Sequence, residues 1–366
     1  MYSDCSTYDW TCAPDGRMGR AAVLAGFGGP EQMVLQPLPN PRLGCHDILV
    51  RVYASSINPI EWKMRAGLGL PHALWRLLLG RRPVLGLDYS GTVIGVGKGV
   101  ERFRPGDQVF GARRLSGAYT ERLVVRETSA LAVKPAQVSH AQAALTPFAG
   151  QIALACLRAG PLRGDLKGRS VMVIGASGGV GHLAVQMARR IFDARQVIGI
   201  CSTRNAEFVA RCGAHSVVAY DQIPPEAIAA SHPDWVDGID LIVDAVGDER
   251  YHAALAGTLL TPHGHYAAAA LPAVSPGRPG EDARLSDLPL LLSRLAGRSA
   301  SGRYTMVTGL IGGLGGAADV SDMALWLADG RLQPHEHAAF TLDQIADAHR
   351  LSETGRTVGK ISIRMS

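Results

Sequence analysis

A glycine-rich turn is the part of this sequence whose residue types and spacing most clearly imply chemistry. The apolar run at 171–174 predicts a buried parallel strand, and an amphipathic helix is expected to begin near Val180. Between them lies the pattern Ala176-x-Gly178-x-x-Gly181, in which alanine replaces the first glycine of the dinucleotide fingerprint. This geometry presents backbone N–H groups at a helix N-terminus to a pyrophosphate. We therefore predict that a dinucleotide is bound by Ser177, Gly178, Gly179, Val180 and Gly181.

The next apolar run indicates which dinucleotide would bind. Residues 196–202 predict a second buried strand, and an NAD site usually places Asp or Glu at its end to hold the ribose 2′-hydroxyl. This chain continues instead with Ser202, Thr203 and Arg204. Two hydroxyls and a guanidinium suit a 2′-phosphate, and no carboxylate in the segment would repel it. We predict NADPH as the cofactor. The alternative is an ordinary polar turn with a solvated arginine.

The same turn also matches a nucleophile elbow. The residues 175–179 fit G-x-S-x-G, and Asp244 is followed by His252, His263 and His265 in the chain order of a hydrolase triad. No HGGG-type oxyanion loop precedes the turn. Gly181 and the second strand are required by a dinucleotide site and not by a hydrolase. The dinucleotide interpretation is therefore preferred.

Composition and length narrow the class of protein. The chain has 366 residues, of which 47% are hydrophobic and 19% charged, with a formal net charge of +5. This length allows two domains, and the scattered basic residues form no stripe that would bind nucleic acid. The six cysteines include no C-x-x-C pair, the N-terminus lacks a signal-peptide pattern, and no run of 18 apolar residues occurs. We expect a cytoplasmic protein without stable membrane insertion.

The order of expected elements indicates how these residues are positioned. Residues 1–18 are polar and predict a flexible extension. Short strands are expected at 21–25, 47–54, 88–96 and 108–110, followed by helical periodicity over 141–159. Strands and helices then alternate to about residue 270, as a doubly wound parallel sheet requires. Further elements are expected at 303–308 (strand), 323–329 and 342–351 (helices) and 359–364 (closing strand). The segments 272–281 and 309–316 are expected to be loops.

Several short motifs, taken together, resemble a known family. They are Ser56-Ile-Asn58-Pro59 with Glu61-Trp62-Lys63, Leu85-Gly-Leu-Asp88-Tyr-Ser-Gly91, Arg104-Pro-Gly-Asp107, the glycine turn and Asp244-Ala-Val-Gly247. From about residue 20 onward the chain resembles the zinc-independent, quinone oxidoreductase-like branch of the medium-chain dehydrogenases/reductases. The resemblance implies an α/β fold with a GroES-like β-rich catalytic domain (19–145 and 299–366) and a Rossmann nucleotide-binding domain (146–298). It also implies a homodimer, with Tyr220 and Val246 at the cofactor.

The resemblance also bears on the metal. Zinc-dependent relatives carry Cys where this chain has Asn58, a Gly-His-Glu triplet near Gly86-Leu87-Asp88, and a four-cysteine lobe. None of the three is present. Asn is not a zinc ligand, so no metal site is expected. His263 and His265 are spaced to chelate a metal, although a solvated or cofactor-adjacent turn is the preferred interpretation.

Without a Lewis acid, hydride transfer requires an acceptor that is already electron-poor, such as a quinone or an α,β-unsaturated carbonyl. Donors to the developing oxyanion would stabilise the transition state. By the resemblance, Asn58 and Lys63 line the cleft, Lys63 standing where several relatives have Tyr, and Tyr89 and Tyr119 are weaker candidates. The structural alternatives are a surface position for Lys63, a capping role for Asn58, and packing, the preferred interpretation, for Tyr89 and Tyr119. Relatives also carry a Thr where this chain has Ile152.

The sequence therefore predicts an NADPH-dependent reductase of a small apolar quinone or enone. The alternatives are a tailoring reductase with one specific substrate in a biosynthetic pathway, and a nucleotide-binding protein without turnover. Two apolar segments, at 70–84 and 285–295, predict a lid over a bulky apolar acceptor, with dimer packing or core burial as the alternative. Trp75 would contact that acceptor.

Overall fold

The computed structural model describes residues 18–39, 41–67, 83–270, 293, 296–299, 301–307 and 315–365. Several predictions fall wholly or largely outside these residues. They are the N-terminal extension, the lid segments at 70–84 and 285–295 with Trp75, the loop at 272–281 and most of the glycine-rich stretch at 309–316.

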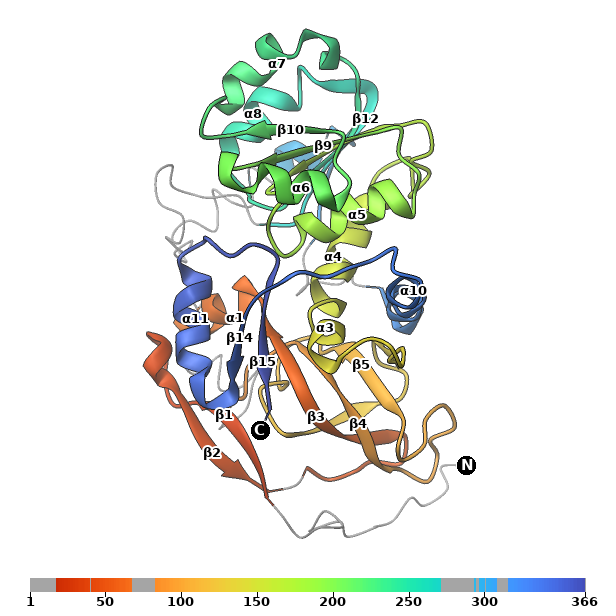
Figure 1. Ribbon diagram of the computed structural model, residues 1–366, viewed down its shortest axis with the longest axis vertical. Coiled ribbons are helices and arrows are strands. Elements are labelled where there is room, and N and C mark those ends of the chain that lie inside the picture. The colour runs from red at the N-terminus through yellow and green to blue at the C-terminus, as the bar shows by residue number, and fades with distance from the viewer. Residues whose placement is uncertain are drawn as a thin grey trace.

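One half of the protein is an antiparallel-rich β domain built from both ends of the chain (Figure 1). Its seven-stranded sheet has the order β14-β15-β3-β4-β5-β7, with β6 paired to β3. A separate two-stranded sheet is formed by β1 and β2. The strands are β1 (Gly19–Leu24), β2 (Met33–Leu38), β3 (Asp47–Ile57), β4 (Asp88–Val96), β5 (Gln108–Ala112), β6 (Arg122–Arg126), β7 (Leu131–Val133), β14 (Glu336–Thr341) and β15 (Lys360–Arg364).

The other half is a six-stranded sheet of order β10-β9-β8-β11-β12-β13, in which every pairing is parallel. Its strands are β8 (Ser170–Ile174), β9 (Gln196–Cys201), β10 (Ser216–Ala219), β11 (Ile239–Asp244), β12 (Leu260–Ala268) and β13 (Tyr304–Met306). The predicted Rossmann sheet is confirmed. Because β13 pairs with β12, this sheet extends beyond the predicted domain boundary at residue 299.

The parallel sheet has hydrophobic cores on both faces. Along β8, Val171 and Val173 belong to one cluster, whereas Met172 and Ile174 belong to the other. This alternation is expected of a strand whose successive side chains point to opposite faces. The helices on this half are α5 (Gly181–Arg190), α6 (Ala206–Cys212), α7 (Ile228–Ser231) and α8 (Glu249–Leu255). Short 3-10 turns lie at Thr203–Asn205, Pro225–Ala227 and Pro233–Trp235.

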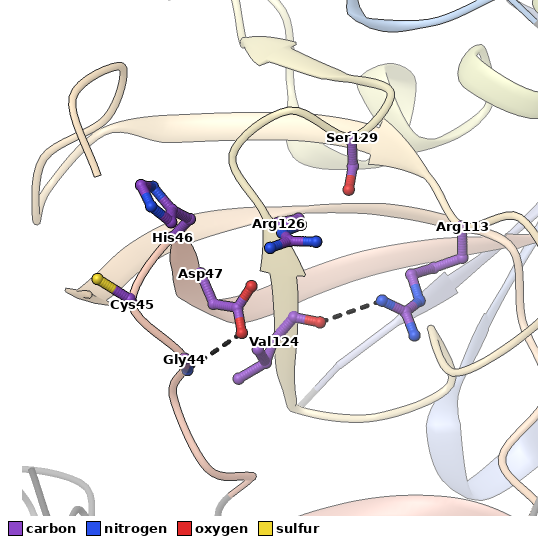
Figure 2. A pocket seen from close by; sticks show the side chains of 8 residues that line it. All are labelled: Gly44, Cys45, His46, Asp47, Arg113, Val124, Arg126 and Ser129. Carbon is purple, nitrogen blue, oxygen red and sulfur yellow. Dashed lines mark hydrogen bonds between the residues drawn. The ribbon is translucent and has the colours of Figure 1, made fainter. Parts of the chain in front are cut away.

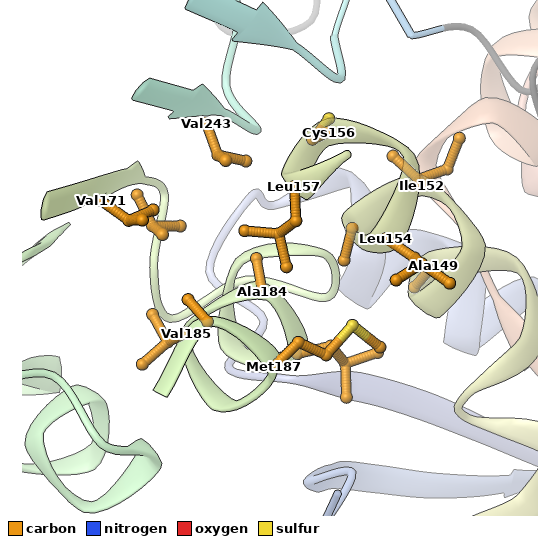
Figure 3. Close-up of a cluster of buried hydrophobic side chains, with 14 of the residues drawn as sticks. Ala149, Ile152, Leu154, Cys156, Leu157, Val171, Ala184, Val185, Met187 and Val243 are labelled. Atoms are coloured by element: carbon orange, nitrogen blue, oxygen red, sulfur yellow. The ribbon is translucent and has the colours of Figure 1, made fainter. Parts of the chain in front are cut away.

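Two helices lie at the junction between the halves, α3 (His140–Ala144) and α4 (Pro147–Leu157). The single helix predicted over 141–159 is therefore interrupted, because Pro147 starts a new helix at a position where its missing N–H costs little. Figure 3 shows α4 packed on α5, with Leu157 beside Ala184 and Val243 close by. Ile152 is buried in the same cluster.

The remaining helices are α1 (Pro59–Ala66), α10 (Ala317–Ala328) and α11 (Ile345–Glu353), with 3-10 turns at Pro30–Gln32 and Leu342–Gln344. α1 begins directly after β3 and is capped by Asn58 and Glu61 in a capping box. In Figure 1, α11 and α1 lie side by side, and the two elements contact each other. Within the described residues, no helix has the length and apolar character that crossing a membrane requires.

Candidate active site

The glycine turn between β8 and α5 has the geometry of a phosphate-binding loop. Gly175 has a φ of +75°, a conformation in which a side chain is strained. A Cβ atom on Gly181 would lie 2.1 Å from the carbonyl oxygen of Gly175, so only glycine fits at the start of α5. At Gly178 the nearest atom to such a Cβ would be 3.3 Å away. The turn therefore leaves backbone N–H groups of the first helical turn accessible to a ligand, with Val180 as the N-cap of α5.

The predicted 2′-phosphate segment follows β9, but a carboxylate lies beside it. Asp221 accepts hydrogen bonds from the backbone N and the Oγ1 of Thr203, both at 2.9 Å. These bonds lower the pKa of Asp221, so its carboxylate is ionised. We expected no carboxylate near residues 202–204, and none occurs within that segment. In the folded protein, however, the carboxylate of Asp221 contacts it. The reason is that β10 is the parallel neighbour of β9, so residues after both strands meet at one edge.

The other side chains of this segment remain available to a ligand. Arg204 is exposed and makes no hydrogen bond or ion pair with any described residue. Tyr220 is 51% exposed, and the buried hydroxyl of Ser202 has no hydrogen-bond partner within the described part of the chain. An arginine, a phenol and an unsatisfied hydroxyl are therefore uncommitted in the segments that follow β9 and β10.

The glycine loop is also tied to the end of the chain. The backbone N of Gly359 donates to the carbonyl of Ser177 at 2.8 Å, and Asn205 donates to the Ser177 hydroxyl at 3.1 Å. A Cβ on Gly179 would lie 3.0 Å from Cδ of Lys360. On the far side, Val246 is exposed at the end of β11. The loop therefore lies between the nucleotide-binding sheet and the first residues of β15.

A closed cluster of buried polar side chains lies beyond Lys360. Asn58, Asp88 and Lys360 are 2%, 0% and 3% exposed. The ammonium of Lys360 donates to the carbonyl of Ile57 at 3.1 Å, to Oδ1 of Asn58, and to Oδ2 of Asp88 at 3.3 Å. The amide nitrogen of Asn58 also donates to Oδ2 of Asp88 at 2.9 Å. All three donors of the ammonium are thus used within the cluster.

Glu61 extends this cluster into the β domain. Its two carboxylate oxygens accept from the backbone and side chain of Asn58, from the backbone of Leu87 at 2.8 Å, and from the hydroxyl of Tyr119. Complete burial raises the pKa of Glu61 to about 7, although the hydrogen bonds and Lys360 oppose the shift. Near neutral pH this carboxyl can therefore hold a proton.

With this geometry established, comparison with known proteins places the chain in a family. Residues 44–135 match the alcohol dehydrogenase GroES-like domain, and residues 212–363 match the family described as zinc-binding dehydrogenase. A mitochondrial NAD(P)H oxidoreductase of Bos taurus is 32% identical over 285 residues, which are 69% of this chain and 68% of that protein. The chain belongs to the medium-chain dehydrogenase/reductase superfamily. Its place is in the quinone oxidoreductase-like branch.

Two further comparisons fit this family assignment. A chloroplast envelope quinone oxidoreductase homolog of Arabidopsis thaliana is 33% identical over 60% of this chain and 65% of the relative, slightly less than two thirds of its length. The structure of the quinone oxidoreductase from Coxiella burnetii superposes with a TM-score of 0.76 over 95% of this chain and all of that one, at 24% identity. The predicted family and fold class are confirmed.

In this medium-chain dehydrogenase/reductase, the three predicted catalytic residues are not brought together. Asn58 is in the cluster, but both ends of its amide are already bonded there. Lys63 lies two residues after Glu61 on α1, so the two point to nearly opposite sides of the helix. Its ammonium is 5.4 Å from the ring centre of Trp62 and makes no hydrogen bond to a described residue.

Tyr89 follows Asp88 on β4, so its side chain points to the opposite face of the strand. It is fully buried in the hydrophobic cluster of the β domain, and its hydroxyl has no hydrogen-bond partner among the described residues. The strand pleat thus directs Tyr89 into the core, which is the packing alternative, and not toward the cleft, as its role as a catalytic candidate required. Sequence reasoning missed Lys360 as a site residue. A lysine at the start of the closing strand, directly after a glycine, was the available signal.

The remaining predicted chemistry can also be located. His265 bonds to Thr305, whereas His263 is exposed, and the described residues contain no group of three or more His, Cys, Asp or Glu side chains able to hold a metal. Asp244 accepts from Val246, Gly247 and Tyr266 rather than from a histidine. The hydroxyl of Ser177 accepts from Asn205. The hydrolase alternative therefore lacks an assembled triad in the described part of the chain.

Proposed function

We propose that this protein is an NADPH-dependent reductase that transfers hydride to a quinone or an α,β-unsaturated carbonyl without zinc. The observation that carries the proposal is the link formed by Gly359 and Lys360, which joins the glycine loop directly to the buried polar cluster around Asn58. The names of the relatives, which include quinone oxidoreductases and an NADPH-dependent alkenal/one oxidoreductase, support the acceptor class.

The residues available to hold NADPH lie in two groups. Backbone N–H groups of Gly179, Val180 and Gly181 would bind the pyrophosphate, whereas the N–H of Gly178 closes the turn by donating to the carbonyl of Gly175 at 2.9 Å. Arg204 and Tyr220, with Ser202 beneath them, would bind the 2′-phosphate, and Val246 would contact the cofactor from the end of β11. When bound, the dihydronicotinamide supplies the hydride. Asp221 opposes phosphate binding by charge, because its bonds to Thr203 keep the carboxylate ionised.

The zinc-independent part of the proposal rests on the donor set beside the loop. A zinc ion requires several Cys, His or carboxylate ligands with free lone pairs. Here Asp88 already accepts from Lys360, Asn58 and Ser56 through one oxygen and from the backbone of Phe148 through the other. The Lys360 ammonium would also repel a second cation. This cluster therefore orients the end of β3 rather than binding a metal.

Negative charge develops on the acceptor oxygen during hydride transfer, so a nearby donor would accelerate the reaction. Lys63 is the predicted residue whose donors remain uncommitted within the described chain. We assign it the hydrogen bond to the acceptor oxygen. Lys63→Met should then lower kcat for an enone roughly 100-fold, in the range of a lost oxyanion donor. Lys63→Arg should retain part of the activity. Full activity in Lys63→Met would remove Lys63 from the mechanism.

Cofactor preference gives a direct test of the nucleotide assignment. Arg204→Ala should weaken the binding free energy of NADPH by about 1.5–3 kcal/mol, because a charge-assisted phosphate contact is lost. The Kd for NADH should be unchanged. Arg211→Ala is a matched control, since Arg211 is also an exposed arginine but bonds to Glu207 instead. An equal loss of NADH and NADPH binding in Arg204→Ala would refute the phosphate assignment.

A second function is favoured by one observation: the amide of Asn58 is fully committed to its neighbours. The protein would then bind the nucleotide without turnover. Following NADPH oxidation by absorbance across a panel of quinones and enones separates the two. Oxidation with many acceptors supports the broad reductase, oxidation with one acceptor supports a tailoring reductase, and binding without oxidation supports the second function.

We also propose a homodimer in the cytoplasm. The buried single thiols of Cys156, Cys201 and Cys212 are consistent with a reducing compartment. A molar mass of twice 38.7 kDa by light scattering is expected, and the monomer mass would contradict the dimer.

A further inference from the structure

A pocket lies in the β domain, where the turn before β3 meets the end of β6. Its volume is about 430 Å³. Figure 2 shows the side chains that line it: Gly44, Cys45, His46, Asp47, Arg113, Val124, Arg126 and Ser129. Asp47 opens β3 and Ile57 closes it, so the Asp47 end of the pocket lies roughly 30 Å along the strand from Asn58. No residue that lines the pocket belongs to the glycine loop or to the polar cluster, so the pocket is distinct from the proposed cofactor site.

Arg113 is a half-buried guanidinium whose partners are neutral. It donates to the backbone carbonyl of Ser116 at 3.0 Å and to that of Val124 at 3.1 Å. Figure 2 shows the bond to Val124. Among the described residues, no carboxylate lies within ion-pair distance of it. Burial lowers the pKa of Arg113, and the charges of Tyr89 and Asp47 oppose this shift only in part. Removing a guanidinium partly from water costs free energy when its hydrogen-bond partners are neutral carbonyls. A bound anion beside it would offset that cost.

Arg126 and Ser129 add a second positive charge and a hydroxyl group to the lining of the same pocket. Arg126 ends β6 with an exposed side chain that makes no hydrogen bond or ion pair to a described residue, and the hydroxyl of Ser129 is likewise unpaired there. Asp47 accepts from the backbone of Gly44 at 3.0 Å, which closes the turn. His46 bonds to Glu127. Two guanidinium groups therefore face the cavity against one carboxylate.

We propose that this pocket binds the oxyanion of a small phosphate- or carboxylate-bearing metabolite through Arg113, Arg126 and Ser129. Guanidinium groups bind planar carboxylates and phosphates through parallel hydrogen bonds, and the serine hydroxyl supplies a third donor. The cavity volume accommodates an organic body in addition to the anionic group.

The pocket also has a short backbone connection to the polar cluster. The backbone N of Arg113 donates to the carbonyl of Leu87 at 2.7 Å, and the backbone N of Leu87 donates to Glu61 at 2.8 Å. Ligand binding at Arg113 would thus act on a residue one step from Asp88. The binding proposal itself does not depend on the activity of the protein.

Isothermal titration calorimetry of the full chain with inorganic phosphate, and separately with succinate, tests the site. Arg126→Gln is the test variant, because this exposed side chain supports no contact in the described chain. Arg104→Gln is the control, since it removes the same charge from an exposed position of the same domain outside the pocket. Anion binding at the nucleotide site is common to both variants and cancels in the comparison.

The expected result is saturable binding that is weakened roughly tenfold or more in Arg126→Gln and unchanged in Arg104→Gln. Ser129→Ala should weaken it by a smaller factor. Tighter binding of phosphate than of succinate identifies a phosphorylated ligand, and the reverse identifies a carboxylate. Equal affinities in the two arginine variants, or no saturable heat with either anion, would overturn the proposal.

Discussion

The ammonium of Lys360 lies 3.3 Å from Oδ2 of Asp88, and both side chains are almost completely buried. Neither residue was assigned a role from the sequence, yet their contact closes the cluster that orients Asn58. Replacing a buried pair by apolar groups can cost little, but removing one partner leaves an uncompensated charge.

Lys360→Met should therefore lower the free energy of unfolding by about 3–5 kcal/mol, because Asp88 is left buried and unpaired. Urea denaturation at neutral pH measures the change. The double variant with Asp88→Asn should recover part of the loss. A decrease below about 1 kcal/mol, typical of exposed pairs, would show that the contact is not a desolvated ion pair.

The stability of the protein should depend on the protonation of Glu61. Its pKa is raised from 4.5 to about 7 by burial, so the folded state binds the proton more tightly than the unfolded state. The contribution of Glu61 to the free energy of unfolding is therefore fully present below pH 4.5. It decreases by up to about 3 kcal/mol as the pH rises to about 7.

Glu61→Gln should remove that decline, so its unfolding free energy should improve relative to the wild type between these pH values. Urea denaturation at a series of pH values measures the difference. Glu207→Gln, which changes an exposed glutamate, is the control. Parallel pH profiles for Glu61→Gln and the wild type would contradict the raised pKa.

Gly181→Ala should disrupt the nucleotide loop, because the new Cβ would lie 2.1 Å from the carbonyl oxygen of Gly175. Overpacking of this kind typically costs about 1–3 kcal/mol of stability, and we expect NADPH binding to be lost as well. Gly257→Ala is a matched control in the same domain, since nothing lies within 4 Å of its Cβ position. Unchanged NADPH affinity in Gly181→Ala would argue against pyrophosphate binding at this turn.

Asp221→Asn should increase the preference for NADPH over NADH. The amide oxygen can still accept from Thr203, whereas the negative charge near the proposed 2′-phosphate is removed. An exposed charge contact is worth about 1 kcal/mol or less, so the ratio of the two Kd values should change by up to about fivefold. Fluorescence titration with both nucleotides gives the ratio. No change would place the phosphate away from Asp221.

Local patterns in the sequence were sufficient for the fold and for the backbone geometry of the glycine turn, one half of the candidate site. The turn around Gly178 lies between a strand and a helix that are contiguous with it, so its spacing alone predicts its structure. The helix break at Pro147 was also visible, because the residue before a proline is biased away from the helical region. It was missed because apolar periodicity continues through it.

The other half of the site depends on pairings that no local pattern encodes. Lys360 reaches the carbonyl of Ile57 across 303 positions of sequence, and Asp221 meets Thr203 only because β9 and β10 are neighbours. The positions of Lys360 and Asp221 were thus fixed by tertiary pairing. Tyr89 differs, because the local alternation of a strand already sends it to the face opposite Asp88.

The strand β15 has a consequence for the order in which the protein is made. Gly359 and Lys360 contact the glycine loop and Asn58, which a ribosome would have synthesised long before them. Until the ribosome releases this strand, the glycine loop and the segment around Asn58 lack the contacts that join them. A translation product that stops short of residue 359 would therefore lack this bridge. The candidate site is thus assembled only after β15 has been made.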